Sequence, residues 1–353
     1  MQTCSYDNIT KNKQEQLESL CCLDYRTSTD KFYRSAQALH VITGILGIYC
    51  SFLYIAKYST KHLLPHNTKV FMSITLAAIV IHSISVTALH IIHLFQSFRA
   101  TADDPCSVQN TAIFCAPFRY TFSFCVLLMM LNQYFIYIDR ILDTFWQSYK
   151  TAQNYIFTFL LAIEVPFTTF IIFFVYRRTD PSEMLLSCLN VPPSTMMDVS
   201  ITTAAFLPLN CLCLVMSILL FQTHQRKIKK SRFDVARHFK ASMNRDAMSF
   251  LRYTTATQAV IIVMYPIVVL TFRFTSHNTP RTLNKTLATL VYLFNWYCLL
   301  VPVVMIYAVK RRRSERQRQI DNVIGQQISG EEASNYYFRL LKNQWEQEME
   351  SRT

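Results

Sequence analysis

Long apolar runs separated by short polar segments make up most of this chain. Seven runs of mostly apolar residues follow one another, at 36–56, 70–95, 112–138, 155–176, 199–221, 250–272 and 287–309. A helix of about 20 apolar residues spans the roughly 30 Å hydrocarbon layer of a bilayer. Lipid offers the backbone no hydrogen-bond partners, so each run is predicted to be helical. The pattern therefore predicts an all-α membrane protein, a bundle of seven transmembrane helices.

The apolar runs divide the chain into three parts. Residues 1–35 are an N-terminal segment, 36–309 the bundle and 310–353 a tail. The N-terminal segment has no basic stretch followed by a short apolar core, so we expect no cleavable signal, and the first span acts as the targeting signal. In the tail, Tyr337, Leu340, Leu341 and Trp345 recur at helical spacing. They predict a short amphipathic helix docked on the membrane or the bundle.

Charge predicts the orientation of the bundle. The net charge is +13, yet only 16% of residues are charged, against roughly 25% in soluble domains. Basic residues gather after the fifth and seventh runs, and the alternate loops carry acids. Lys and Arg mark the cytoplasmic side of membrane proteins, so the C-terminus is expected in the cytoplasm and the N-terminus outside. This placement favours membrane lipids over nucleic acid as the partner of the positive charge.

Two sequons lie on the side predicted to be extracellular. Asn8 begins Asn-Ile-Thr in the N-terminal segment, and Asn284 begins Asn-Lys-Thr before the seventh run. Both are candidate glycosylation sites, and Asn8 is the better candidate because Asn284 is close to the membrane.

Cysteines in the predicted extracellular loops are candidates for disulfide bonds. The chain has eleven cysteines; Cys106 and Cys188 lie in the first and second outer loops, an oxidising compartment. The positions favour a Cys106–Cys188 bridge, with Cys115 as the alternative partner of Cys188. Cys4, Cys21 and Cys22 are expected to pair within the N-terminal segment, with connectivity open.

An acid and an arginine, Asp139 and Arg140, end the third run at its predicted cytoplasmic side. Such a pair can act as a switch: held together it stabilises one state, and released, the arginine can contact a partner. The alternative is that Arg140 is an interfacial anchor. Basic residues of the next cytoplasmic loop are further candidates for partner contact, namely Arg226, Lys227, Lys229 and Lys230. Such a loop also suits anionic lipid.

Charged and histidine residues inside the runs are ligand-pocket candidates. Arg119 lies one turn inside the third run and Glu164 just before Pro166 in the fourth. A charge at this depth is costly and usually faces the bundle interior or a water-filled cavity. Arg119 suits an acidic ligand or a structural partner, although it could instead reach the outer headgroups. His93, in the second run with His82 and His90, is the third candidate, and hydrogen bonds to neighbouring helices are the simpler interpretation.

Several functional classes are disfavoured. The four glycines cannot form a phosphate-binding loop. No nucleophile–base pair or metal-ligand set stands out, so we predict no catalytic residues, no metal, no cofactor and no enzyme activity. The seventh run has no central lysine for a retinal Schiff base. A seven-span ligand-gated channel or transporter remains the alternative, although no internal repeat supports it.

Several short motifs together resemble the nematode serpentine chemoreceptors. They are 65–69 (PHNTK), 104–106 (DPC), Cys115, Arg119, 138–140 (IDR) and Tyr337-Phe338 with Leu341 and Trp345. Within that group the chain looks like the Sra superfamily, class alpha or the neighbouring alpha/beta class. It departs at Asp143-Thr144, where Ala-Thr is more usual, which adds an acid at the predicted coupling face.

The resemblance implies a rhodopsin-like G-protein-coupled receptor. Such a receptor detects small environmental chemicals in the plasma membrane of sensory neurons, often in the cilium, and signals through a heterotrimeric G protein. These are expectations from the resemblance; the apolar runs and charges predict only a seven-helix bundle with a basic inner face.

Overall fold

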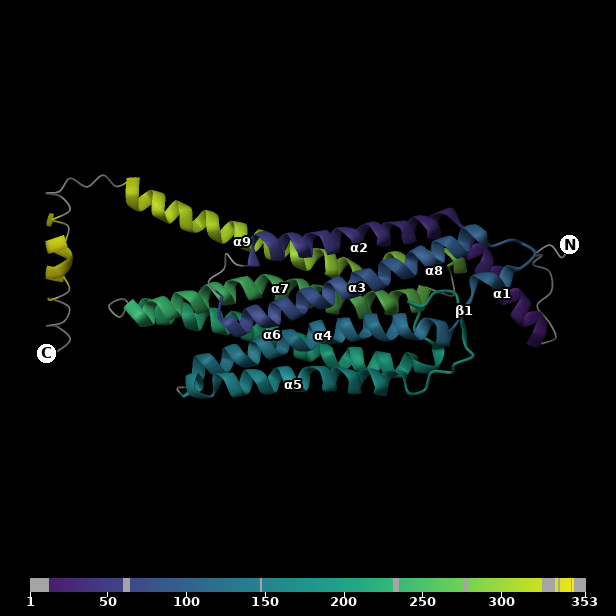
Figure 1. Cartoon of the computed structure of the whole chain (residues 1–353), viewed down its shortest axis with the longest axis horizontal. Helices are drawn as coiled ribbons and strands as arrows, with labels where there is room; N and C mark the ends of the chain where they lie inside the picture. The colour runs from purple at the N-terminus through teal and green to yellow at the C-terminus, as the bar shows by residue number, and fades with distance from the viewer. Residues whose placement is uncertain are drawn as a thin grey trace. The chain divides into compact units, whose positions relative to one another are not determined.

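The structure is a computed structural model that describes residues 13–59, 64–146, 148–230, 235–275, 279–325, 334–335, 337–343 and 345. It is helical almost throughout (Figure 1). The chain separates into two compact units, residues 1–306 and 307–353. The first unit holds the helix bundle, and the second begins within the last long helix.

Long helices follow each other in chain order and pack as a bundle. They are α2 (Lys31–Lys57), α3 (His66–Arg99), α4 (Ala112–Phe145), α5 (Tyr149–Tyr176), α6 (Met196–Lys230), α7 (Val235–Thr275) and α9 (Leu293–Gly325). α2 packs on α3, α3 on α4, α4 on α5, and α6 on α7. Local capping fixes two of the starts: Asp30 accepts from the backbone of Phe32 and Tyr33 before α2, and Thr111 from Phe114 N before α4.

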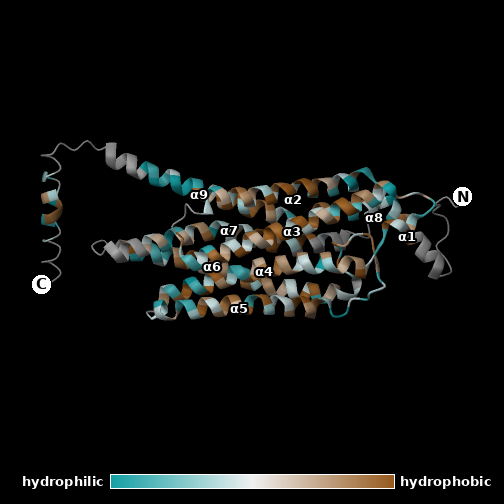
Figure 2. Ribbon diagram, viewed as in Figure 1, coloured by the Kyte–Doolittle hydropathy of each residue, from teal (hydrophilic) through white to brown (hydrophobic). Residues whose placement is uncertain are grey.

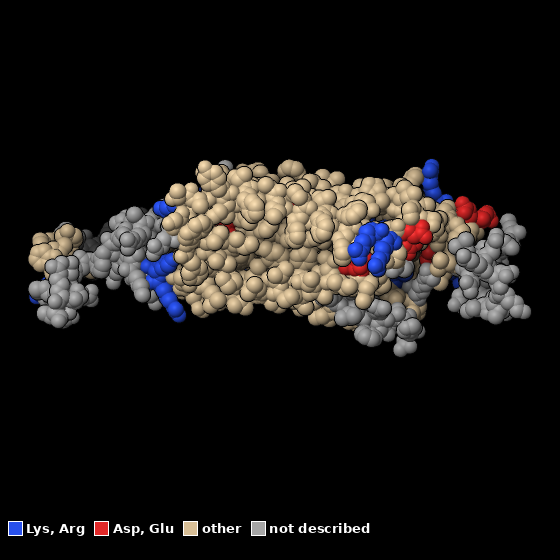
Figure 3. All heavy atoms as spheres, turned by 90° about the horizontal axis from the view of Figure 1, so that it is seen from below, with Lys and Arg blue, Asp and Glu red and all other residues tan. Residues whose placement is uncertain are grey.

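The outer surface of the bundle is apolar and its interior is partly polar. Within the described residues, six helical stretches are long and apolar enough to cross a membrane, and the predicted sixth run, 250–272, lies within α7. Phe170 and Phe173 are 63% and 73% exposed, whereas His82 and Asn132 are fully buried. On the face drawn in Figure 3, Lys, Arg, Asp and Glu gather toward the ends, and Figure 2 shows the same distribution as hydropathy. This arrangement suits a lipid solvent.

The seventh apolar run is divided between two helices. α8 (Arg281–Leu290) stops before Val291 and α9 starts at Leu293. The predicted span 287–309 therefore begins inside α8 and crosses a break in the helix. Non-helical backbone at membrane depth is tolerated where it is buried in protein or lines a cavity, and Tyr292 lies at this break.

The N-terminal segment contains a helix that the sequence pattern did not predict. α1 (Lys13–Thr29) packs against α8 and against the short helix η2 (Pro105–Val108). Gln109 Nε2 donates to Asp24 Oδ2 over 2.8 Å, and Ser97 Oγ donates to the carbonyl of Ser28. These contacts tie the N-terminal helix α1 to the last turn of α3 and to the loop between α3 and α4.

Two disulfides lie at the same end of the bundle, which we call the cystine end. One joins Cys21 of α1 to Cys106 of η2, with Cα atoms 4.7 Å apart. The other joins Cys115 of α4 to Cys188, with Cα atoms 4.9 Å apart. Cys22 is also disulfide-bonded; Cys4 lies outside the described residues.

The favoured Cys106–Cys188 bridge is therefore corrected. η2 packs on α1, which brings Cys106 to Cys21. The strand β1 (Asn110–Thr111) pairs antiparallel with β2 (Met184–Leu185), which brings Cys188 to Cys115. The expectation that Cys21 pairs within the N-terminal segment is corrected by the same contact.

Candidate functional site

Two polar sites lie along α4, one toward each end. Arg119 and Arg140 are 21 residues apart on this helix, or about 30 Å at about 1.5 Å per residue. Both side chains are buried, with 2% and 3% of their surface exposed. A buried arginine without compensation is costly, so the partners of each decide what the site can do.

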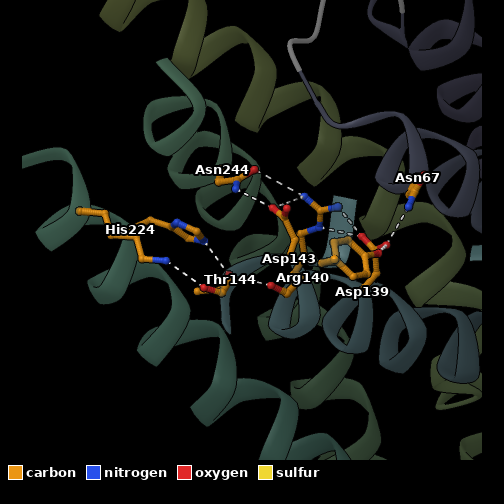
Figure 4. A network of polar contacts seen from close by, with 9 residues as sticks. Asn67, Asp139, Arg140, Asp143, Thr144, His224 and Asn244 are labelled. Carbon is orange, nitrogen blue, oxygen red and sulfur yellow. Dashed lines mark hydrogen bonds and ion pairs between the residues drawn. The ribbon is translucent and has the colours of Figure 1, made fainter. Parts of the chain in front are cut away.

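The Arg140 cluster joins five helices (Figure 4). We use this name for residues of α3, α4, α5, α6 and α7 connected by polar contacts around Arg140: Asn67, Asp139, Arg140, Asp143, Thr144, Tyr149, His224 and Asn244. Because its members come from separate helices, the cluster couples the positions of those helix ends.

Asp139 is held by donors from three helices. Arg140 Nε donates to Asp139 Oδ2 over 2.9 Å, and Arg140 Nη2 bonds the same oxygen. Asn67 Nδ2 of α3 donates to Oδ1 over 2.7 Å, and the hydroxyl of Tyr149 of α5 donates to it as well. Charge-assisted hydrogen bonds of this kind are strong. The carboxylate therefore fixes the ends of α3 and α5 against α4.

Asp143 and Asn244 form the second half of the cluster. Arg140 Nη1 lies 3.8 Å from Asp143 Oδ2, one helical turn away. Asn244 Nδ2 of α7 donates to Asp143 Oδ2 over 2.8 Å, and Asn244 Oδ1 accepts from Arg140 Nη1 over 3.5 Å. The acid that departs from the family pattern thus faces Arg140 and binds α7.

Thr144 connects α4 to α6. Its hydroxyl donates to the carbonyl of Arg140 over 2.7 Å and lies 3.2 Å from His224 Nε2. Lys227 Nζ donates to the Thr144 carbonyl over 2.9 Å. Lys227 is a coupling candidate from the sequence; Arg226 beside it is exposed, and the side chains of Lys229 and Lys230 lie outside the described part.

The arrangement holds Arg140 inside the bundle rather than at the interface. Its guanidinium has acidic partners on its own helix and an amide partner on α7. Sequence reasoning found Asp139 and Arg140 but missed Tyr149, His224 and Asn244. These residues lie in polar stretches without a distinguishing spacing, so no signal in one sequence separated them from their neighbours.

A cavity of ≈ 120 Å³ lies beside Arg119. Its walls come from α4, α5, α6, α7, the start of α9 and the segment after Cys188. Most of the lining is apolar or aromatic, including Phe122, Ile172, Phe206, Ile262 and Tyr265. A concave, mostly apolar site with few polar groups is the usual form of a small-molecule pocket.

Arg119 brings the charge to this cavity. Its guanidinium carbon lies 5.9 Å from the centre of the Tyr176 ring. Its Nε and Nη2 are buried without a hydrogen-bond partner among the described residues. The Tyr176 hydroxyl is 2.8 Å from Ser123 Oγ, which fixes the ring. The structure places Arg119 in the interior, so it does not reach toward the outer headgroups.

Tyr292 lies at the break between α8 and α9 and also lines the cavity. Its ring stacks on His82 with centroids 6.0 Å apart, and its hydroxyl lies 3.1 Å from His82 Nε2. His82 Nδ1 is 3.3 Å from Cys298 Sγ. Sequence reasoning missed Tyr292 because nothing in an apolar run marks a helix break.

The remaining pocket candidates lie elsewhere. His93 Nε2 accepts from Cys188 N over 3.4 Å, and its Nδ1 is 3.3 Å from Gln96 Oε1, so it supports the disulfide loop. Glu164 is buried, its Oε1 has no hydrogen-bond partner among the residues that the structure describes, and it does not line the cavity. Neither is brought to Arg119.

The two sequons have different settings. Asn284 is half-buried within α8, and the Thr286 hydroxyl donates to the carbonyl of Thr282 over 2.8 Å. Asn8 lies outside the described residues. Glycosylation at either residue stays a prediction. Among the described residues, no group of three or more metal-ligating side chains is present.

The fold and the two sites define a class of membrane receptor. An apolar helix bundle has a disulfide-stapled end, an internal cavity and a buried Asp–Arg pair at the far end of α4. Residues 19–345 match the family described as serpentine type 7TM GPCR chemoreceptor Sra, and the chain belongs to this family.

Known relatives support this membership along nearly the whole chain. Serpentine receptor class beta-18 of Caenorhabditis elegans is 38% identical, covering 98% of this chain and 95% of the relative. Class beta-16 of the same organism is 20% identical, covering 94% of this chain and 98% of the relative. Class alpha-9, also of Caenorhabditis elegans, is 24% identical, covering 74% of this chain and 77% of the relative. The predicted resemblance to the Sra superfamily is confirmed. On class, where alpha or the neighbouring alpha/beta class was expected, the relative with 38% identity is a class beta receptor.

Proposed function

We propose that this protein is a plasma-membrane chemosensory receptor that converts binding of a small environmental chemical into activation of a heterotrimeric G protein. Family membership supports a receptor that resembles G-protein-coupled chemoreceptors. The Arg140 cluster is the observation that carries the proposed coupling step. It joins the ends of α3, α4, α5, α6 and α7 through one arginine.

The cluster supports a two-state switch. In this structure Arg140 is bonded to Asp139, faces Asp143 and is linked to α7 by Asn244. A state in which these contacts open would free the guanidinium for the carbonyls of a Gα subunit. A ligand shifts such an equilibrium only if it binds one state better. The cavity at Arg119 is built from helices that also reach the Arg140 cluster. A ligand bound there could therefore have a different affinity for the two states of the cluster.

Charge and disulfides support an orientation with the Arg140 end in the cytoplasm and the N-terminus outside. Exposed Lys150 and Arg226 lie near the Arg140 cluster in the chain, as the positive-inside rule requires. The cystine end carries two bridges, which form in oxidising compartments. Sensory-neuron cilia are the location that the family resemblance suggests.

The experiment is ligand-independent and ligand-stimulated GTPγS binding in membranes that contain the full chain and one Gα type at a time. Arg140→Ala should abolish the exchange that the wild type supports. Arg140→Lys keeps the charge but loses the planar fork and should restore little. Lys150→Ala removes an exposed cation near the same end of the bundle and should leave exchange unchanged. Undiminished exchange with both Arg140 variants would exclude the proposed coupling role.

A ligand-gated channel or transporter is the competing class. Patch-clamp recording on the same cells separates it from a receptor. A ligand-evoked current that survives without any Gα subunit would favour the channel. A glycan on Asn8 would support an outside N-terminus, as the receptor requires.

A further inference from the structure

The cavity beside Arg119 has one charged wall. Among the residues that line it within the described part of the chain, Arg119 is charged and the others are neutral. The neutral polar groups are already bonded in part: Ser123 to Tyr176, and Thr203 to the carbonyl of Val199 over 2.8 Å. The cavity therefore presents a cation surrounded by apolar and aromatic side chains.

Arg119 has no acidic partner in the part of the chain that the structure describes. Its Nε and Nη2 are both buried and without a hydrogen-bond partner among the described residues. Glu183 acts on Arg119 only through space, without an ion pair, and its Oε2 accepts from Ser194 Oγ over 3.1 Å. The cation–π contact with Tyr176 is a weak substitute for hydrogen bonds, so the desolvation cost of this buried guanidinium is only partly offset.

The surrounding structure fixes where this cation lies. Cys115, one helical turn before Arg119, is bonded to Cys188. Leu189 and Asn190, which follow Cys188, line the same cavity. The bridge thus holds this loop segment against α4, next to the Arg119 guanidinium. A preformed site of this kind costs little to order when a ligand binds.

We propose that this cavity binds a small organic carboxylate, with Arg119 as its counter-charge. Two guanidinium nitrogens match the two oxygens of a carboxylate. The apolar walls argue for an organic anion rather than an inorganic one. A cavity of about 150 Å³ holds benzene in another protein, so ≈ 120 Å³ suits an acid with a short aliphatic chain. The inference deepens the proposed receptor function and rests on it.

Matched pairs of probes test the charge requirement. Butanoate and pentanoate are compared with butanamide and pentanamide, which have similar shape without the charge, and with inorganic phosphate. The first readout is the thermal unfolding midpoint of the purified full chain, because a ligand that binds only the folded state raises it. The acids should raise the midpoint, and the amides and phosphate should not.

Variants test the role of Arg119. Arg119→Gln should weaken acid binding roughly 10- to 100-fold, as expected for loss of a charged hydrogen-bond pair, and Arg119→Lys should keep part of it. Arg99→Gln removes an exposed arginine near the cystine end and should change nothing. Val126→Phe fills the cavity while Arg119 remains, so it should also prevent binding. If Arg119→Gln does not fold, Val126→Phe and the amide pairs still decide the question.

The second readout, acid-stimulated GTPγS binding, separates this inference from the proposed function. Acids that stabilise the wild type without stimulating any Gα would support the site and count against coupling. Amides that stabilise the chain as well as acids, or phosphate that does so alone, would overturn the carboxylate site. Stabilisation that Arg119→Gln leaves intact would overturn it too, whatever the coupling assay gives.

Discussion

Asn244 of α7 and Asp143 of α4 are joined by a hydrogen bond of 2.8 Å between Nδ2 and Oδ2. The same amide accepts from Arg140 Nη1 over 3.5 Å. Through this one side chain, α7 is attached both to the acid and to the arginine at the end of α4. A movement of α7 away from α4 must break both contacts, so Asn244 opposes opening of the Arg140 cluster.

Asn244→Ala should therefore raise ligand-independent G-protein activation. A hydrogen bond to a charged group is worth about 1.5–3 kcal/mol. Loss of one such bond from the closed state alone would therefore raise the ratio of open to closed receptor roughly tenfold or more. GTPγS binding without ligand measures the change. Asn154→Ala, which removes an exposed amide on α5, should have no effect. Unchanged or reduced basal exchange in Asn244→Ala would contradict the role assigned to this contact.

The disulfide connectivity makes a prediction that is independent of signalling. Digestion of the unreduced protein should yield linked peptides that contain Cys115 with Cys188 and Cys21 with Cys106. Mass spectrometry identifies them directly. A peptide linking Cys106 to Cys188 would contradict the fold of the cystine end.

Removal of the Cys115–Cys188 bridge tests how much it stabilises the folded chain. The double variant Cys115→Ala, Cys188→Ala removes a bridge between residues that are 73 positions apart in the sequence. The loss of this cross-link from the unfolded chain is expected to lower the free energy of unfolding by about 4 kcal/mol. The thermal unfolding midpoint should fall, and acid binding at Arg119 should weaken because the loop over the cavity is no longer held to α4. A variant with normal stability and binding would show that the bridge does not position the site.

The two arginine sites show how far one sequence leads. Arg119 could be predicted as a buried candidate because a charge inside an apolar run has few favourable positions. The sequence could not decide whether Cys188 pairs with Cys106 or with Cys115, since Cys106 lies just before the third apolar run and Cys115 at its outer end. The choice is made by packing of η2 on α1 and by the register of β1 with β2. These are tertiary contacts between segments far apart in the chain.

Polar partners were harder to find than charged ones. Asn67 falls within a motif that carried the family resemblance, and the structure gives it a physical role as a donor to Asp139. Tyr149 donates to the same carboxylate from α5, and Asn244 of α7 donates to Asp143 and accepts from Arg140, but an amide or a phenol near a helix end is common. The seven apolar runs predicted the bundle well because lipid constrains every span alike. The break at Tyr292 depends on its neighbours and left no pattern.

Close contact between α2 and α3 depends on Gly44. A Cβ at this position would lie 2.2 Å from Thr87 Oγ1, and threonine is restricted in χ1. Gly44→Ala should therefore destabilise the chain by about 1–3 kcal/mol through overpacking. Thr87→Ala removes the obstructing hydroxyl, so the double variant should recover most of the loss. Thermal unfolding of the wild type, the two single variants and the double variant gives a double-mutant cycle. Additive effects of the two substitutions would contradict this contact.

Ile262 of α7 tests the size limit of the cavity. It is 3% exposed, lines the cavity and packs in a core cluster with Met130, Leu131 and Phe206. Ile262→Ala should cost about 2–5 kcal/mol because it leaves a void. The same void lengthens the space beside Arg119, so a longer acid should fill it and return part of that stability. Octanoate should then raise the unfolding midpoint of Ile262→Ala more than that of the wild type, while pentanoate shows the opposite order. Octanamide is the matched control and should stabilise neither chain. Equal responses of both chains to octanoate would place the binding site for the acid outside this cavity.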